Sequence, residues 1–240
     1  MSDPLLRVSD AGLYCARGDF YIDPWKSVKR AVITHGHADH ARSGSDKYFS
    51  TQSGASILRH RLRDIDLEAY GYGESFRIGD ATVSFHSAGH VLGSAQVRVE
   101  VDGEVWVASG DYKRSADPSC APFELVPCDV FITEATFALP VYCWPPGETV
   151  AKEILQWWDR NAKAGRNSVL LCYALGKAQR VLAELAQLTD RGVYLHGAVD
   201  SIVELYRDAG VSMLPTERVD GRDKKKKFSG ELVIAPPSAA

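Results

Sequence analysis

The chain has no apolar run close to the roughly 20 residues that a membrane-spanning helix needs. Its N-terminus also lacks the basic and apolar regions of a secretory signal peptide. With 28 lysines and arginines against 31 aspartates and glutamates, the net charge is −3. No overall positive field therefore favours nucleic acid, and any phosphate-binding surface must be local.

Cysteine is scarce and irregularly placed. The chain has five cysteines, an odd number with no CxxC spacing, which argues against a disulfide framework. Free thiols are typical of a reducing compartment, so we expect a cytoplasmic protein. The cysteines are Cys15, Cys120, Cys128, Cys143 and Cys172.

The remaining composition is that of an α/β protein, and its pattern changes once along the chain. The 240 residues are 45% hydrophobic and 25% charged, enough for one large domain or two small ones. Short strands and hairpin signals fill the first part, whereas helices and strands alternate after Pro145-Pro146-Gly147. We therefore expect domains at 1–146 and 147–240, the second a small parallel α/β unit.

The densest cluster of metal-ligand residue types is Thr34–His40. It contains His35, His37 and His40, three of the seven histidines, together with Asp39. The β-branched run before it predicts a buried strand that ends in this loop. Imidazole and carboxylate groups in a small volume suit zinc, with manganese or iron as alternatives. The competing interpretation is a polar loop that happens to be rich in histidine.

Four other candidates follow predicted strands. His90 lies in a loop flanked by glycines, Asp111 and Glu134 each end a strand, and Asp23 precedes a proline that stops another. Acidic and imidazole groups at several strand ends indicate that these ends meet at one edge of a sheet. His86, inside an alternating strand, is instead expected to be structural.

Three more patterns concern local structure. Ser53 is expected to cap a helix over 55–63, and a further helix is expected over Ser201–Ala209. The run Lys224–Lys227 predicts either a solvated loop or a contact with a phosphate backbone.

These motifs resemble those of a known fold. The run from His35 to His40, then Ala88-Gly89-His90, then Ser109-Gly110-Asp111 resemble successive ligand motifs of the metallo-β-lactamase fold, and Asp23 resembles its first aspartate. Glu134 resembles the acidic motif of the nucleic-acid-processing branch, which carries a β-CASP insertion, and residues 168–180 resemble its opening strand and helix. The resemblance implies an α/β fold, an αββα sandwich with a partial β-CASP α/β insertion.

Three further stretches resemble the bacterial ligase-associated DNA exonucleases, some of which are labelled mRNA 3′-end processing factors. They are Gly18–Trp25, Leu139–Tyr142 and Ile234–Ser238. The resemblance implies a metal-dependent phosphodiesterase for DNA repair, in which metal-activated water attacks phosphorus. It also implies single-stranded DNA or DNA ends as partners, with RNA as an alternative, and association with an ATP-dependent DNA ligase and a helicase.

The resemblance further implies two divalent metal ions, zinc or alternatively manganese. One ion is expected at His35, His37 and His90, and the second at Asp39 and His40, with Asp111 as the bridge. Asp39, Asp111, Asp23 and Glu134 are the implied catalytic residues.

Lys177 and Arg180 are the candidates for binding a backbone phosphate, and solvated helix charges are the alternative. Ala135 stands where the acidic motif of the family has serine, and two later histidine motifs of the family have no counterpart after His196. We therefore expect a C-terminally truncated chain with an incomplete second metal site and weak or no activity.

Three alternatives stay open. The first is an RNA-processing nuclease of the same superfamily, because metal motifs do not distinguish DNA from RNA. The second is a small-molecule hydrolase of the thioesterase or lactamase type, which the Glu134 motif and residues 173–180 disfavour. The third is a catalytically impaired fragment that binds metal and nucleic acid.

Overall fold

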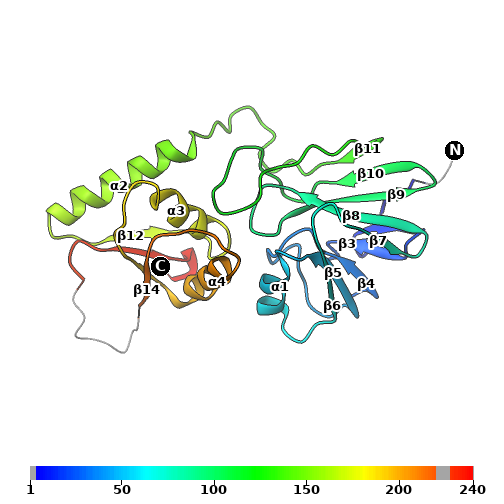
Figure 1. Ribbon diagram of the computed structural model, residues 1–240, viewed down its shortest axis with the longest axis horizontal. Coiled ribbons are helices and arrows are strands. Elements are labelled where there is room, and N and C mark those ends of the chain that lie inside the picture. The colour runs from blue at the N-terminus through cyan, green and yellow to red at the C-terminus, as the bar shows by residue number, and fades with distance from the viewer. Residues whose placement is uncertain (1–3, 220–227, 240) are drawn as a thin grey trace. The chain divides into compact units, whose positions relative to one another are not determined.

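The computed structural model describes residues 4–219 and 228–239, so the run Lys224–Lys227 lies outside the described residues (Figure 1). The chain forms two compact units, each with its own core. Unit 1 comprises Met1–Ala116 and Cys120–Thr136, and unit 2 comprises Asp117–Ser119 and Phe137–Ala240. No helix within the described ranges is long and apolar enough to cross a membrane.

The first sheet of unit 1 has six strands in chain order. The first three form the antiparallel meander that the glycine-punctuated N-terminal sequence predicts, and the later strands pair in parallel. Helix α1 (Ala55–Leu62) connects the last two strands. The strands are β1 (Arg7–Val8), β2 (Leu13–Cys15), β3 (Phe20–Ile22), β4 (Arg30–Val32), β5 (Lys47–Thr51) and β6 (Leu67–Tyr70).

The second sheet of unit 1 has the order β11-β10-β9-β8-β7. Its pairs are antiparallel except β10 with β11, which run in the same direction. Asp111 and Glu134 follow these two strands, so both residues lie at one end of the sheet. The strands are β7 (Ser75–Ile78), β8 (Ala81–Ser87), β9 (Ala95–Val101), β10 (Glu104–Ala108) and β11 (Val130–Ile132).

The two sheets of unit 1 pack face to face through apolar side chains that alternate along the strands. Phe20 and Phe49 of the first sheet share a core with Phe85 and Val97 of the second. On β8, the polar residues between the core positions point to the other face, as the two-residue period of a strand requires. Leu58 of α1 packs on the outer face of the first sheet. Helix α1, the first sheet and the second sheet therefore form consecutive layers, as expected for the αββα sandwich that the resemblance implies.

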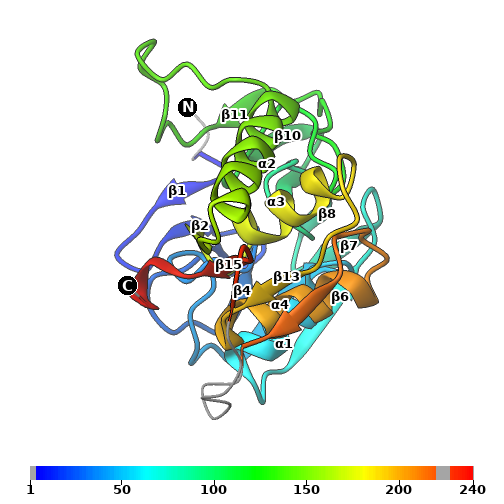
Figure 2. The same ribbon diagram turned by 90° about the vertical axis from the view of Figure 1, so that its left-hand side faces the viewer.

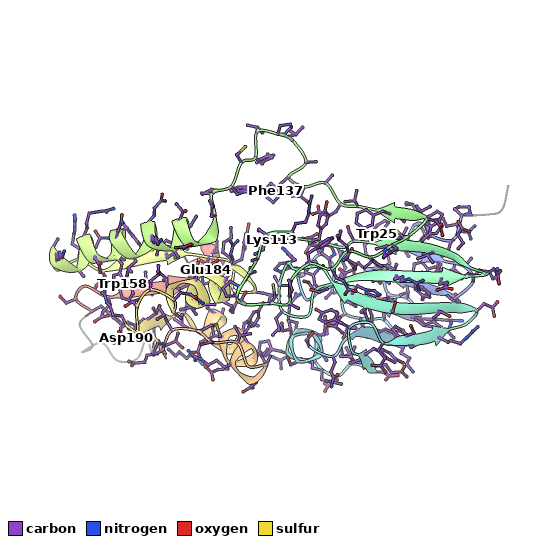
Figure 3. All side chains as sticks on the ribbon, turned by 45° about the horizontal axis from the view of Figure 1, so that its top comes forward. Trp25, Lys113, Phe137, Trp158, Glu184 and Asp190 are labelled. Atoms are coloured by element: carbon purple, nitrogen blue, oxygen red, sulfur yellow. The ribbon has the colours of Figure 1, made fainter. Side chains whose placement is uncertain are left out.

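Unit 2 is a four-stranded, fully parallel sheet with the order β12-β15-β13-β14. Its core joins the apolar faces of the helices to one face of the sheet (Figure 2). Trp158 of α2, fully buried, donates its Nε1–H to the Gly230 carbonyl oxygen (2.9 Å; Figure 3). The elements are α2 (Gly147–Lys163), β12 (Ser168–Leu171), α3 (Lys177–Leu185), β13 (Val193–Leu195), α4 (Gly197–Asp208), β14 (Thr216–Arg218), β15 (Leu232–Ala235) and a 3-10 turn at Pro237–Ala239.

Helix α1 begins at Ala55, as the sequence predicts, but its N-cap and the start of α4 differ from the sequence-based expectations. Ser53 does not cap α1, because Gly54 occupies the N-cap position without a side-chain hydrogen bond. Helix α4 begins at Gly197 rather than at Ser201, because the His196 side chain accepts a hydrogen bond from the Ala198 amide (3.2 Å). Histidine is not among the residues preferred at an N-cap, so capping propensity gives no signal for a helix start at Gly197.

Candidate metal centre

Four of the predicted ligands converge at the end of β4 and the loops after β8 and β10. His35, His37, His90 and Asp111 each offer one ligand atom, and these atoms all lie within 4.8 Å of one another. Among the residues with described positions, this is the one group of its kind. Three imidazole nitrogens and one carboxylate oxygen are a donor set typical of zinc.

The distances within this group show which atoms face one another. His35 Nε2 lies 2.9 Å from His37 Nδ1, and His90 Nε2 lies 3.3 Å from the same nitrogen. Asp111 Oδ2 is 3.8 Å from His35 Nε2 and 3.5 Å from His90 Nε2. These four atoms therefore face a common point, and a cation there would replace close nitrogen–nitrogen approaches by ligand bonds.

Asp111 also faces a second, looser group. Its other oxygen, Oδ1, lies 3.3 Å from His40 Nε2, which in turn is 3.7 Å from Asp39 Oδ2. The Asp39 side chain is 74% exposed, whereas that of His40 is only 20% exposed. Asp111 thus directs one oxygen to each group, the arrangement that a bridging carboxylate requires.

Asp23 holds two of the histidines in orientation. Its Oδ2 accepts a hydrogen bond from His40 Nδ1 (2.7 Å) and another from the Thr34 hydroxyl (2.5 Å), while Oδ1 accepts from the Thr34 amide (2.8 Å). Because the Thr34 hydroxyl proton goes to Asp23, its oxygen is free to accept from His35 Nδ1–H (3.1 Å). Both imidazoles then keep a proton on Nδ1, and Nε2 of each ring points toward the ligand groups.

Burial determines the protonation of His35 and His90. Burial, followed by the neighbouring histidines, holds the pKa of His35 well below its ordinary value. Burial and then His37 lower the pKa of His90 to about 4. Both rings are therefore neutral at physiological pH, which is the form that binds a metal.

His40 and Asp111 form a charged pair. Burial opposes the charge on His40, but hydrogen bonds with Asp111 and Asp23 outweigh it and raise its pKa to about 10. The hydrogen bond from His40 likewise lowers the pKa of Asp111. In the second group the charge of His40 thus compensates that of Asp111, whereas in the first group the neutral rings of His35 and His90 face the same carboxylate.

The His90 loop is held by one serine and two glycines. Ser94 Oγ accepts hydrogen bonds from the amides of His90 (3.0 Å) and Val91 (3.1 Å). A Cβ at Gly89 would lie 2.3 Å from the Lys113 carbonyl oxygen, and a Cβ at Gly93 would lie 2.2 Å from the Gly54 Cα. Both glycines also have a positive φ. Close backbone approach, which the sequence predicts here, is therefore required on both sides of His90.

The remaining predicted residues lie elsewhere. The Glu134 carboxylate accepts hydrogen bonds from the amide and hydroxyl of Thr136 (2.9 and 2.5 Å). Lys177 is exposed at the start of α3 in unit 2. Arg180 Nε lies 3.6 Å from both Asp117 and Glu184, so its charge already has partners within that unit.

His86 is outside the group, as the sequence suggested. Its ring contacts Ser84 Oγ (3.0 Å) and Glu124 Oε1 (2.8 Å) on the outer face of β8. Three residues with a part in the site were not assigned one from the sequence: Thr34, Ser94 and Arg61. Arg61 of α1 donates to the Gly36 carbonyl oxygen between the two histidines. Threonine next to the first histidine was a visible signal, but nothing in the sequence marked Arg61.

The chain is similar to several curated proteins over much of its length. It is 29% identical over 236 residues to a probable DNA ligase of Opitutus terrae, covering 95% of this chain and 22% of that protein. An RNase J-like protein of Methanocaldococcus jannaschii is 23% identical over 211 residues, which cover 75% of this chain and 50% of that protein. The endoribonuclease YSH1 of Eremothecium gossypii is 26% identical over 171 residues, with 68% and 21% covered.

The chain is a relative of the metallo-β-lactamase-fold nucleases of the β-CASP branch. It spans between 21% and 50% of the length of these three relatives. No family model matches it. A crystal structure of a protein of unknown function from Enterococcus faecalis V583 has the same fold, with a TM-score of 0.63 at 10% identity over 86% of this chain and 58% of that chain.

The donors found here fit the divalent metal ions that the metallo-β-lactamase fold suggests. Neutral His35 and His90, His37 and the Asp111 carboxylate form a four-atom group suited to a divalent ion. The second group offers Asp39, His40 and the other Asp111 oxygen, with wider spacing. The first group is therefore expected to bind more tightly than the second.

We predict that the purified chain binds one divalent ion tightly and a second ion more weakly. The reason is that four convergent ligand atoms form the first group, whereas the second is open and partly exposed. Zinc titration by calorimetry, with elemental analysis after dialysis, measures both sites. His37→Ala should abolish the tight site, and His60→Ala, an exposed histidine on α1, should leave it intact. Two equally tight ions would contradict the prediction.

We also predict that Asp23→Asn weakens metal binding by about 10-fold to 100-fold, the usual effect of removing a partner of a metal ligand. An amide has only one accepting oxygen, so its NH2 group would face either the Thr34 amide or the Thr34 hydroxyl and His40, which now donate to separate oxygens of Asp23. The measurement is the zinc affinity of the variant. Asp10→Asn, the same change at an exposed surface carboxylate, is the matched control. Equal affinities of the two variants would remove Asp23 from this role.

Proposed function

We propose that this chain belongs to a metal-dependent nuclease that hydrolyses phosphodiester bonds in DNA, as a ligase-associated exonuclease of DNA repair. The observation that carries the proposal is the pair of ligand groups joined by the two oxygens of Asp111. Two metal ions bound side by side supply an activated water and neutralise charge on a phosphate. Zinc is the proposed metal, with manganese as the alternative, since the donors are mainly imidazole.

The roles of the chain's own residues follow from their contacts. His35, His37 and His90 would hold the first ion, and Asp39 and His40 the second. Asp111 would hold both groups at a fixed separation because one carboxylate serves them. Asp23 would hold the proton on Nδ1 of His40 directly, and that on Nδ1 of His35 through Thr34, so that Nε2 of both rings points inward.

Two acidic residues complete the proposed catalytic set. Asp39 is exposed, so its carboxylate is open to solvent and could orient an entering water. Glu134 follows the strand parallel to the one before Asp111, at the same end of the sheet. Its carboxylate organises Thr136 and thereby the start of the next segment, which supports a positioning role.

Lys177 and Arg180 are proposed to contact backbone phosphates. Lys177 is the stronger of the two, since it is exposed and opens a helix, whose N-terminal amides favour anions. Arg180 would have to share its charge with Asp117 and Glu184. Both residues belong to the proposed β-CASP domain at 147–240, with the metallo-β-lactamase domain at 1–146.

The proposed setting is the cytoplasm, with DNA ends or single strands as substrate. The five cysteines, all of which the structure describes, form no disulfide with one another, which agrees with a reducing compartment. The relative from Opitutus terrae is named a probable DNA ligase, which supports association with an ATP-dependent ligase. A helicase partner is proposed from the family resemblance.

RNA is the second candidate substrate. The RNase J-like relative and the endoribonuclease relative match 75% and 68% of this chain, so the shared residues also suit RNA cleavage. DNA is preferred because the relative with the ligase name matches 95% of the chain at higher identity. DNA and RNA differ at the 2′-hydroxyl, so cleavage rates of a DNA strand and an RNA strand of the same sequence distinguish the two candidates.

We predict slow, metal-dependent cleavage of single-stranded DNA and slower cleavage of the RNA of the same sequence. Single-turnover assays with excess protein and end-labelled strands, with and without zinc or manganese, measure both. Asp111→Asn should reduce the rate by roughly 100-fold or more, because ligand loss costs at least as much as losing a partner of a ligand. His60→Ala should keep the rate.

Two other outcomes of this assay would contradict the proposed function. Faster cleavage of RNA would replace DNA by RNA in the proposal. Tight metal binding without cleavage of either strand would overturn the nuclease function of this chain and favour the alternative of a binding fragment.

For the phosphate contact, we predict that Lys177→Gln flattens the salt dependence of single-strand binding. Each lost phosphate contact lowers the slope of log affinity against log salt by about 0.7 for a single strand. Fluorescence anisotropy at several salt concentrations gives the slope. Lys163→Gln, an exposed lysine at the end of α2, is the control with the same charge change. An unchanged slope for Lys177→Gln would exclude Lys177 from the interface.

A further inference from the structure

An aromatic segment without a packing partner follows the acidic motif. Every residue from 135 to 146 is exposed, and the chain runs there as a loop from Phe137 to the start of α2 (Figure 3). Phe137 is 59% exposed, Tyr142 44% and Trp144 70%. Large aromatic side chains usually lie in a core, so three in one exposed loop call for an explanation.

The three rings are arranged against one another. Tyr142 and Trp144 are nearly parallel, with centroids 6.3 Å apart and planes 13° apart. Phe137 stands edge-on to both, at 5.2 Å from Tyr142 and 5.5 Å from Trp144. The segment therefore presents ordered ring faces to solvent.

The backbone of this segment is restrained, which lowers the cost of binding. Pro140, Pro145 and Pro146 fix φ within and after it. The Tyr142 amide donates to the Leu139 carbonyl oxygen (3.1 Å), which closes a turn. A preorganised surface loses less conformational entropy when a ligand binds.

The chemistry of the segment selects one class of ligand. Residues 137–147 contain no charged side chain, so nothing in them attracts phosphate or an anionic membrane surface. Ring faces do attract the flat, uncharged faces of nucleobases, and this contact tolerates any sequence. Unpaired bases expose those faces, whereas bases in a duplex hide them.

The position along the chain links the segment to the candidate metal centre. Phe137 follows Glu134 by three residues, which span at most about 11 Å. Glu134 lies at the end of β11, at the same sheet end as Asp111. The segment is therefore joined to the strand end that carries Glu134 by a short stretch of chain.

We propose that Phe137, Tyr142 and Trp144 form a stacking surface for unpaired bases of a single-stranded nucleic acid. This inference rests on the proposed nuclease function and deepens it, because it names the single strand as the bound form and bases as the recognised groups. The aromatic surface would hold the strand through its bases, while charged groups elsewhere hold its phosphates.

The test compares substitutions of Trp144 in the full chain. Trp144→Leu keeps an apolar side chain but removes the ring, and Trp144→Phe keeps a ring. We expect Trp144→Leu to weaken binding of a fluorescent single-stranded DNA by about 5-fold to 150-fold, the usual effect of losing a base–aromatic stack. Trp144→Phe should lose less. Leu125→Ala, at an 86% exposed leucine in unit 1, is the control for loss of apolar surface.

Two further readouts separate stacking from other contacts. An abasic oligomer keeps the phosphates and lacks the bases, so Trp144→Leu should not change its affinity. The slope of affinity against salt concentration should also stay that of the parent chain, because no charge is removed. Binding of blunt duplex DNA should be unaffected.

The outcomes distinguish this inference from the proposed function. Equal affinities of the Leu and Phe variants and the parent chain for single strands, with metal-dependent cleavage intact, would overturn the stacking surface and leave the nuclease proposal standing. Loss of self-association in Trp144→Leu without loss of DNA binding would also overturn it and assign the segment to a contact between copies. Stacking effects without any cleavage would support the surface and contradict the nuclease.

Discussion

The candidate metal centre depends on one carboxylate that is not itself in the four-atom group. Asp23 accepts hydrogen bonds from the Thr34 amide, the Thr34 hydroxyl and His40. Through them it fixes where the protons of two imidazoles lie, and thereby which nitrogens face inward. Its backbone φ of 44° is left-handed, a conformation that aspartate tolerates better than most residues. Asp23, in the turn after β3, thus orients the histidines of the loop that follows β4.

The fold brings the other ligands to the same place through strand direction. Strands β3 and β4 pair in parallel, so Asp23 and Thr34 follow neighbouring strands at the same end of the first sheet. The Ala95 amide, at the start of β9, donates to the Thr34 carbonyl oxygen (2.8 Å) and ties the second sheet to this loop. Sheet packing therefore positions ligands that are far apart in the sequence, from His35 to Asp111.

The sequence was informative where a residue type and its loop agreed. Glycines on both sides of His90 predicted close backbone approach, and the structure has backbone atoms where their side chains would lie. The sequence was uninformative where a site residue is held by a hydrogen bond from a residue of another loop position or another secondary-structure element. Ser94 and Arg61 resemble ordinary loop and helix residues, and only the folded chain shows their bonds to His90 and Gly36. The His196 cap of α4 was missed because capping propensity favours smaller side chains.

The difference between the two ligand groups has a chemical meaning. The first group brings four ligand atoms within 4.8 Å of one another, two of them on the neutral rings of His35 and His90, and such a group holds an ion firmly. The second group combines the exposed Asp39 with His40 and one oxygen of a shared carboxylate, so positions around it are open to solvent. Catalytic metal sites keep such open positions for water and substrate, whereas structural sites close them. For the proposed nuclease, this asymmetry favours chemistry at the second group, with the first group as the fixed frame against which a phosphate would be held.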